Sequence, residues 1–311
     1  MSKPSLQALG STALALAVLV LAAWLAWRQL HGVQLADIVA ALHATAAPRL
    51  VASACLTALS FACLAQYERL ATGWVAPGRV PRAEAWRTGL AAHALANTLG
   101  FHVLTAGAVR WRAYAPRGLA LAEVVRIVAV VAACVGAGVI ALAVVALVAW
   151  QFDADARGRW LALGLVALAA AWLLLRARAA RVGADAPGGD ASASPARSHV
   201  LLLAGIGLVE MGAAVAALYV LLPTGVAQPA PFALAFLAAM LLGLASHVPG
   251  GLGVFEAGIL AALAPAPAVG VLAALLAYRA IYNLLPFAIT AMALLLSRAR
   301  VARPVDQFEA G

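Results

Sequence analysis

Charged and polar residues in apolar surroundings are the first residues of this chain that could do chemistry. Glu210 sits near the middle of an apolar run at 199–222, and Arg279 sits inside another. Tyr282 and Asn283 follow Arg279 at i+3 and i+4, which places all three on one face of a helix. A charged group inside a bilayer is costly unless it is paired, protonated or facing water. These residues therefore predict a stripe of polar side chains, within the membrane, that binds a charged group.

A glycine-rich turn adds to this stripe. A Pro-Gly-Gly sequence interrupts the apolar region 231–263 near its middle, and such a sequence favours two half-helices joined by a turn. The glycines would leave backbone N–H groups uncovered, and the next half-helix would present its positive end to them. This construction suits an anion, and we expect the phosphate of a phospholipid headgroup. The candidate substrate-binding residues here are His247, Gly250, Gly251, Gly253 and Glu256.

A stretch at 101–110 looks like a copy of the turn region at 246–256. Aligned on their His-Val pairs, the two share a second valine seven residues after the histidine and a charged residue one or two positions further on. Matching broken helices in two halves of a membrane protein point to a transport site. Arg110 and Arg112 of the first stretch are further substrate-binding candidates, because a guanidinium forks onto two phosphate oxygens.

The charged candidates also have structural interpretations that the sequence leaves open. Arg110 and Arg112 could extend from the membrane interface to the headgroups. Glu210 and Arg279 could form a buried pair with no substrate role. Glu256 could stabilise the positive end of its own half-helix.

Metal and cofactor chemistry is not expected. We interpret His102 and His247 as partners of backbone carbonyls at the turns rather than as metal ligands. The three cysteines lie in apolar windows without CxxC spacing, so we interpret them as packing residues. No GxxxxGK[ST] loop occurs, so direct use of ATP is not expected either.

The composition places all these residues in a bilayer. Of 311 residues, 65% are hydrophobic and 11% are charged, which exceeds the apolar surface that a soluble protein of this size can bury. The predicted fold class is all-α: a polytopic membrane protein with six full spans plus two re-entrant helical hairpins arranged as an inverted repeat. The hairpins are expected in the interrupted regions 84–114 and 231–263. The predicted spans are residues 7–27, 49–66, 121–150, 159–175, 199–222 and 268–296.

The charge of the loops predicts the orientation. The net charge of +9 lies mostly at helix ends and in short loops, which favours contact with anionic lipid over nucleic acid. Basic residues flank region 84–114, whereas loop 223–229 has no charge. The positive-inside rule then places both termini in the cytoplasm, and the two hairpins enter from opposite sides. The expected divisions are one transmembrane domain at 1–311, repeats at about 7–150 and 159–296, and a cytoplasmic tail at 297–311.

Several motifs resemble one known family. They are similar to the membrane region of lysylphosphatidylglycerol synthases and their stand-alone relatives. In the first half, residues 104–106 (LTA) stand where a Pro-Gly-Gly type of turn would be expected. The similarity covers most of the chain, from about residue 7 to 296. The matching positions are PGGLGVFEA at 249–257, Tyr278-Arg279 and NLLP at 283–286, and in the first half NTL at 97–99, Gly107, Arg110 and Tyr114.

The resemblance implies a bacterial inner-membrane protein whose membrane domain moves lipid between leaflets. In full-length members, aminoacyl transfer is attributed to a separate soluble domain after the last span, and here a short tail follows residue 296. We therefore expect no lysyl transfer and no enzyme activity. The expected partner is a membrane phospholipid with an anionic headgroup, and a lipid-synthesis enzyme is a further candidate.

Three classes of function stay open. The first, which we favour, is a lipid translocator or flippase that exposes a midplane cavity to each side in turn. Its movement of lipid would run down a gradient or be coupled to ions, with Glu210 and Glu256 as candidate proton carriers. The second is an intramembrane enzyme acting on lipids, for which the HExxH and GxSxG motifs are both absent. The third is a non-catalytic membrane partner of a lipid-synthesis enzyme.

Overall fold

The structure is a computed structural model that describes residues 34–100, 102–150, 197–246 and 248–301. These ranges are helical and contain no strand, which confirms the all-α class. The predicted spans at 7–27 and 159–175 lie outside the described residues, and so does His247.

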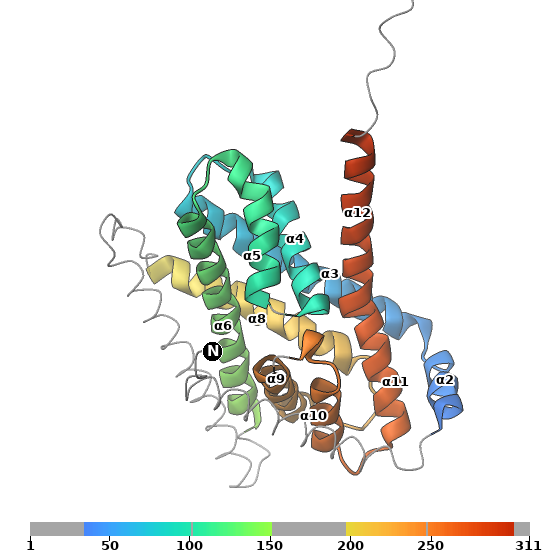
Figure 1. Ribbon diagram of the computed structural model, residues 1–311. Helices are drawn as coiled ribbons and strands as arrows, with labels where there is room; N and C mark the ends of the chain where they lie inside the picture. The colour runs from blue at the N-terminus through green and yellow to red at the C-terminus, as the bar shows by residue number, and fades with distance from the viewer. Residues whose placement is uncertain (1–33, 101, 151–196, 247, 302–311) are drawn as a thin grey trace, which may run out of the picture.

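Within each half, the described helices follow one another with short connections (Figure 1). The first half contains α2 (Leu35–His43), α3 (Ala47–Val75), α4 (Arg82–Leu99), α5 (His102–Tyr114), the single turn η1 (Ala115–Arg117) and α6 (Leu121–Trp150). The second half contains α8 (Arg197–Tyr219), α9 (Pro229–Ala245), the turn η2 (Pro249–Gly251), α10 (Val254–Ala262), α11 (Ala268–Tyr278), the π-helical segment η3 (Arg279–Leu284) and α12 (Leu285–Val301).

Within the described ranges, three helical stretches are long and apolar enough to cross a membrane, and they are Ala47–Val75, Leu121–Trp150 and Ala268–Leu296. The predicted helices at 121–150 and 268–296 are confirmed, and the predicted span at 49–66 lies inside the longer α3. Region 199–222 forms α8, whose described apolar part, Gly205–Tyr219, is shorter than a full span.

Both interrupted regions consist of two helices separated by a break. In the second region, α9 and α10 pack against each other, and the Pro-Gly-Gly turn lies between them as predicted. In the first region, the predicted position of the break is wrong. Helix α4 ends at Gly100, which adopts φ 77°, while residues 104–106 lie inside the continuous helix α5. A single glycine in a left-handed conformation ends α4, with no proline involved.

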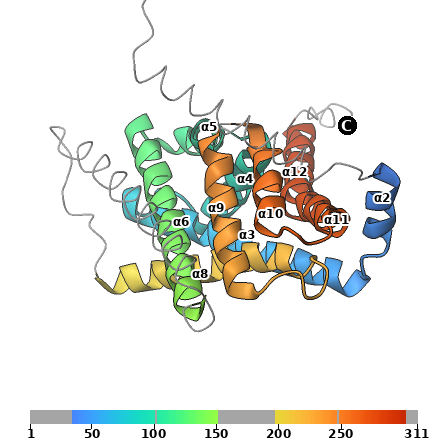
Figure 2. The ribbon, with the colours of Figure 1, turned by 90° about the horizontal axis from the view of Figure 1, so that it is seen from below.

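The long helices pack through small residues where they cross (Figures 1 and 2). Helices α6 and α8 approach most closely at Gly138 and Gly207, where a Cβ added to Gly207 would lie 2.5 Å from the Cα of Gly138. Small residues allow such close backbone approach in membrane helices. Helix α3 packs against both α4 and α8, and it thereby joins the first hairpin to the second half.

An aromatic series forms part of the main core. Neighbouring members of this series have ring centroids between 5.0 and 6.4 Å apart, in stacked, tilted or edge-on arrangements. It connects the end of α8 to the middle of α3 through α9, α10, α11 and η3. Its members are Tyr219, Phe232, Phe236, Phe255, Tyr278, Tyr282 and Phe61.

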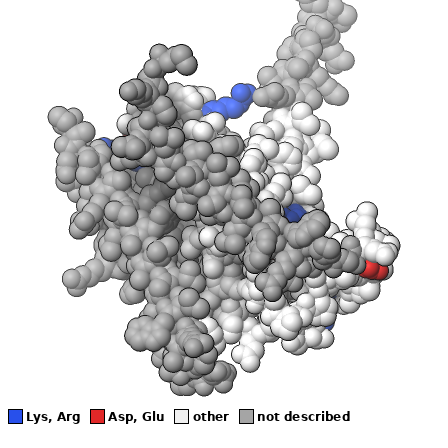
Figure 3. All heavy atoms as spheres, turned by 60° about the horizontal axis from the view of Figure 1, so that its bottom comes forward, with Lys and Arg blue, Asp and Glu red and all other residues white. Residues whose placement is uncertain are grey.

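The outer surface of the long helices is apolar. Large hydrophobic residues are exposed along α6 and α12, with Val125 at 57%, Ile289 at 63% and Leu295 at 63% exposure. On the face in Figure 3, the described atoms belong almost entirely to uncharged residues, with a few isolated charged groups. Large hydrophobic residues exposed along helices of this length are compatible with contact with lipid.

Candidate functional site

The two hairpins meet tip to tip. We define the first tip as residues 97–100 at the end of α4, and the second tip as residues 249–251, the turn η2. A Cβ added to Gly100 would lie 2.8 Å from the backbone nitrogen of Gly250 and 2.9 Å from the Cα of Pro249. A Cβ added to Gly250 would lie 3.1 Å from the carbonyl oxygen of Thr98. The tips therefore touch through their backbones, and a side chain at Gly100 would separate them.

The segment η3 contacts the first tip through Asn283. The Asn283 side-chain amide donates a hydrogen bond to the carbonyl of Asn97 at 3.0 Å, and the Thr98 hydroxyl donates to the carbonyl of Asn283 at 3.1 Å. Pro286 follows η3 and has no N–H to give to the preceding turn, which favours the wider π turn seen here. Both the backbone carbonyl and the side chain of Asn283 thus bind the first tip.

The same segment contacts the second tip through Arg279. Its Nε donates to Oε1 of Glu256 at 2.6 Å, and one terminal nitrogen donates to the carbonyl of Gly250 at 2.7 Å. The guanidinium also lies over the ring of Phe255, 5.3 Å from its centroid. The Arg279 and Glu256 side chains are 16% and 17% exposed, respectively. Arg279 is therefore a partly accessible cation that braces the glycine turn.

The amides of the glycine turn are not all uncovered, as the sequence suggested. The N–H of Gly251 donates to the carbonyl of Val248 at 2.9 Å, and the N–H of Gly253 donates to Oε2 of Glu256 at 2.7 Å. The prediction of uncovered amides is wrong for these two glycines, because the turn satisfies its own donors. The interpretation of Glu256 as a stabiliser of its own half-helix is confirmed, and Glu256 binds Arg279 as well.

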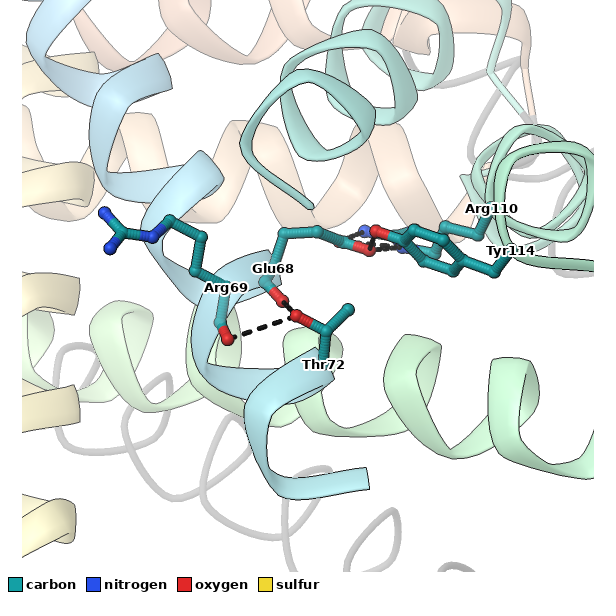
Figure 4. A network of polar contacts seen from close by, with 5 residues as sticks. All are labelled: Glu68, Arg69, Thr72, Arg110 and Tyr114. Carbon is teal, nitrogen blue, oxygen red and sulfur yellow. Dashed lines mark hydrogen bonds and ion pairs between the residues drawn. The ribbon is translucent and has the colours of Figure 1, made fainter. Parts of the chain in front are cut away.

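A second Glu–Arg pair lies in the first half, between α3 and α5 (Figure 4). Arg110 donates from Nε and from one terminal nitrogen to Oε2 of Glu68, at 2.9 and 2.7 Å. The Tyr114 hydroxyl donates to Oε1 of the same carboxylate at 2.8 Å. The Arg110 and Glu68 side chains are 2% and 0% exposed. The interfacial interpretation of Arg110 is therefore wrong, whereas Arg112, on the same helix, is exposed.

Glu68 is a residue that the sequence analysis missed. It is the sole acidic residue of α3, and the predicted span ended at residue 66, two positions before it. An acidic residue in a long apolar helix was the signal that could have identified it. The partner of Arg110 could not have been identified from the sequence, because the pair joins α3 to α5, two helices that both pack against α4.

Glu210 lies in a third polar cluster, between α8, α3 and η3. The Ser60 hydroxyl donates to Oε1 of Glu210 at 3.2 Å, and it shares a hydrogen bond of 2.8 Å with the Tyr282 hydroxyl. All three side chains are buried. The predicted Glu210–Arg279 pair is wrong, since Arg279 pairs with Glu256. Tyr282 and Asn283, adjacent in η3, serve different clusters: Tyr282 faces Glu210, and Asn283 faces the first tip.

His102 begins α5 and is exposed, with Nε2 lying 3.2 Å from Oδ1 of Asn97. Its partner is a side-chain amide and not the backbone carbonyl that we predicted. In the ranges that the structure describes, no group of three or more His, Cys, Asp or Glu side chains is arranged to hold a metal ion.

Comparison with known proteins adds one relative. A scan against models of protein families finds no match. An uncharacterized protein of Synechocystis sp., slr0712, is 42% identical to this chain over 106 residues, which make up 32% of this chain and 33% of the relative. The match therefore spans about a third of the length of the curated relative. The name of this relative assigns no activity, so the functional argument depends on the geometry.

Proposed function

We propose that this chain is an integral membrane translocator that moves a phospholipid, or a related lipid with an anionic headgroup, between the two leaflets. The observation that carries the proposal is the contact between the hairpin tips, in which Gly100 lies against Pro249 and Gly250. Broken helices that meet inside a membrane protein are typical of transport sites. The motif resemblance to the membrane region of lysylphosphatidylglycerol synthases favours the same function.

In this proposal, the tips form the closed barrier of the transport path. The two hairpins enter the bilayer from opposite sides as parts of an inverted repeat, and both termini face the cytoplasm of a bacterial inner membrane. One tip is held by Asn283 and the other by Arg279, so η3 connects the two. A rearrangement of η3 would release both tips together and would open the path toward one side or the other.

Arg279 is the residue that we assign to the headgroup. Its present partners, the Glu256 carboxylate and the Gly250 carbonyl, are oxygen acceptors like those of a phosphate. A phosphodiester entering between the tips would exchange with one of them, and the guanidinium would keep its hydrogen bonds throughout. The glycines at 250, 251 and 253 allow the turn to change shape during this exchange, because each has a positive φ in the closed form.

The test is lipid movement in liposomes that contain the purified full chain. The liposomes are made of phosphatidylethanolamine and phosphatidylglycerol with a trace of fluorescent phosphatidylglycerol, and an impermeant quencher reports the outer leaflet. We expect the wild-type chain to accelerate exchange between leaflets. Gly100→Ala should slow this exchange by about tenfold, equivalent to roughly 1.4 kcal/mol, because the added methyl group keeps the tips apart and the cycle cannot return to its closed form.

The matched control is Gly107→Ala. Gly107 lies inside α5 of the same hairpin, and a Cβ added there meets no atom within 4 Å. This variant should move lipid at the wild-type rate. Exchange no faster with the wild-type chain than in protein-free liposomes would contradict the proposed function. Equal rates for Gly100→Ala and Gly107→Ala would contradict the role of the tips.

A further inference from the structure

We propose that Glu210 is a proton-binding site that controls the hold of η3 on the two hairpin tips. The proton would thus be the ion whose movement is coupled to opening of the transport path. The coupling of the proton to lipid movement rests on the function proposed above. The binding of the proton and the response of the tips can each be measured without any lipid substrate.

The first argument is the burial of Glu210 without a countercharge. The residue is 2% exposed, and its Oε2 has no hydrogen-bond partner among the described residues. The ion pairs within the described ranges join other residues, so no described arginine, lysine or histidine lies within 4 Å of this carboxylate. A buried carboxylate with an unsatisfied oxygen is costly, whereas the neutral acid is tolerated.

The second argument is the character of the surrounding groups. Helix α9, which packs against α8, contains no titratable residue. The titratable groups near Glu210 are all neutral in their ordinary protonated forms, so none supplies the missing positive charge. A proton is therefore the charge that this site can gain. These neighbours are Cys63 and Tyr67 on α3, Tyr278 on α11 and Tyr282 on η3, and Cys134 on α6 is in turn a neighbour of Tyr67.

The third argument concerns the Ser60 hydroxyl, which lies between Glu210 and Tyr282 and can donate its one proton to only one of them at a time. With Glu210 ionised, Ser60 donates to Oε1 and accepts from the Tyr282 hydroxyl. Hydronium then transfers a proton to the unpartnered Oε2 and leaves as water, which converts the carboxylate to a neutral acid. Oε1 becomes a weaker acceptor, and the Ser60 proton turns toward Tyr282. Protonation therefore reverses the direction of the Ser60–Tyr282 hydrogen bond.

The fourth argument is the position of Tyr282 in η3. Its ring stacks on that of Tyr278 at 5.0 Å, and it lies between Arg279 and Asn283 in the sequence. Those two residues hold the second and the first tip, respectively. A reorientation of Tyr282 would therefore alter both tip contacts through a six-residue π segment. Isolated π turns in α-helices frequently occur at functional sites.

The proton itself is tested by infrared difference spectroscopy. The purified full chain in detergent is moved between alkaline and acidic buffer, and the C=O stretch of a protonated carboxylic acid is recorded. We expect a band that titrates with pH in the wild-type chain and is absent from Glu210→Gln. A spectrum identical in the two proteins would overturn the proposal. Lipid movement plays no part in this measurement, so its failure is distinct from failure of the proposed function.

The coupling to the tips is tested by distance measurement. Leu99 lies in the first tip and Leu252 directly follows the second, and they are 48% and 59% exposed, so both accept a spin label after substitution by cysteine in a chain whose native cysteines are replaced. We expect the distance distribution to differ between acidic and alkaline buffer. In Glu210→Gln it should stay at the acidic distribution, because the amide imitates the neutral acid. A wild-type distribution that does not change with pH would overturn the proposal.

A second variant keeps the test decisive if Glu210→Gln does not fold. Tyr282→Phe retains the ring and its stacking but lacks the hydroxyl that meets Ser60. It should keep the titrating infrared band, since Glu210 is intact, and lose the response of the tips to pH. Tips that respond in Tyr282→Phe as in the wild-type chain would contradict the proposed route through η3.

Discussion

The two Glu–Arg pairs of the halves have similar chemistry and different surroundings. In the first half, Glu68 and Arg110 join two neighbouring helices, and both side chains are almost completely buried. In the second half, Glu256 and Arg279 join α10 to η3 beside a glycine turn, and each side chain is about one-sixth exposed. The first carboxylate is further bonded by Tyr114, whereas the second arginine is bonded to a backbone carbonyl.

This difference separates a structural pair from a candidate working pair. A fully buried pair is lost only at a large cost, because breaking it leaves an uncompensated charge in an apolar interior. A partly exposed pair beside a glycine turn can exchange partners at lower cost, because glycine backbone changes conformation readily and other acceptors can reach the arginine. Equal chemistry therefore does not imply an equal role in the two halves.

The largest expected effect is on stability, from Arg110→Gln. The substitution leaves the Glu68 carboxylate buried without its cation, and we expect a loss of about 3–5 kcal/mol in the free energy of unfolding. Denaturant unfolding in detergent, followed by tryptophan fluorescence, measures it. Arg112→Gln is the control, since Arg112 lies on the same helix and is exposed. A similar stability for both variants would remove the distinction between the pairs.

A smaller stability change, with a larger functional change, is expected from Arg279→Gln. Removing the guanidinium takes away its hydrogen bonds to Glu256 and Gly250, and we expect a stability loss of about 1–2 kcal/mol for this partly exposed site. Transbilayer lipid movement should fall by tenfold or more, about 1.4 kcal/mol or above. The liposome assay measures the loss of lipid movement, and the unfolding assay measures the loss of stability. Wild-type lipid movement in Arg279→Gln would show that both pairs are structural.

The smallest effect is expected at the exposed pair between Arg117 and Glu84, whose side chains are 47% and 26% exposed. Arg117→Gln should change the free energy of unfolding by less than about 1 kcal/mol, because water screens such pairs. Added salt should reduce the difference further. Unfolding at low and high salt measures this baseline. A loss as large as that of Arg110→Gln would mean that burial does not set the rank order of the pairs.

The helices were predictable where one signal extends over many residues. Region 121–150 is apolar throughout, and its helix has the bounds expected from the sequence. The break in the second hairpin was also predictable, because proline and two glycines occur together there. The break in the first hairpin was misplaced, since it depends on the φ of Gly100 alone, and a lone glycine is common within membrane helices.

The candidate site was predictable in its residue types and less so in its pairings. Arg279 and Glu256 were identified separately, each from its place in an apolar region, but their contact joins residues 23 positions apart. The contact between the tips could not be identified at all. It joins Gly100 to Gly250 through backbone atoms, and neither hydropathy nor charge records such a contact. Glu210 was identified, but its partners Ser60 and Tyr282 depend on how three helices pack.

The crossing of α6 and α8 has a mechanical consequence. At Gly138 and Gly207 the two backbones touch, with bulkier residues such as Leu142 and Met211 one turn further along each helix on the same face. Sliding either helix along its axis would drive one of these side chains into the opposite backbone, whereas a change of crossing angle would not. The pair therefore resembles a scissor joint with a fixed pivot. Glu210 lies less than one turn beyond that pivot, so even a wide swing of α8 would displace its carboxylate very little.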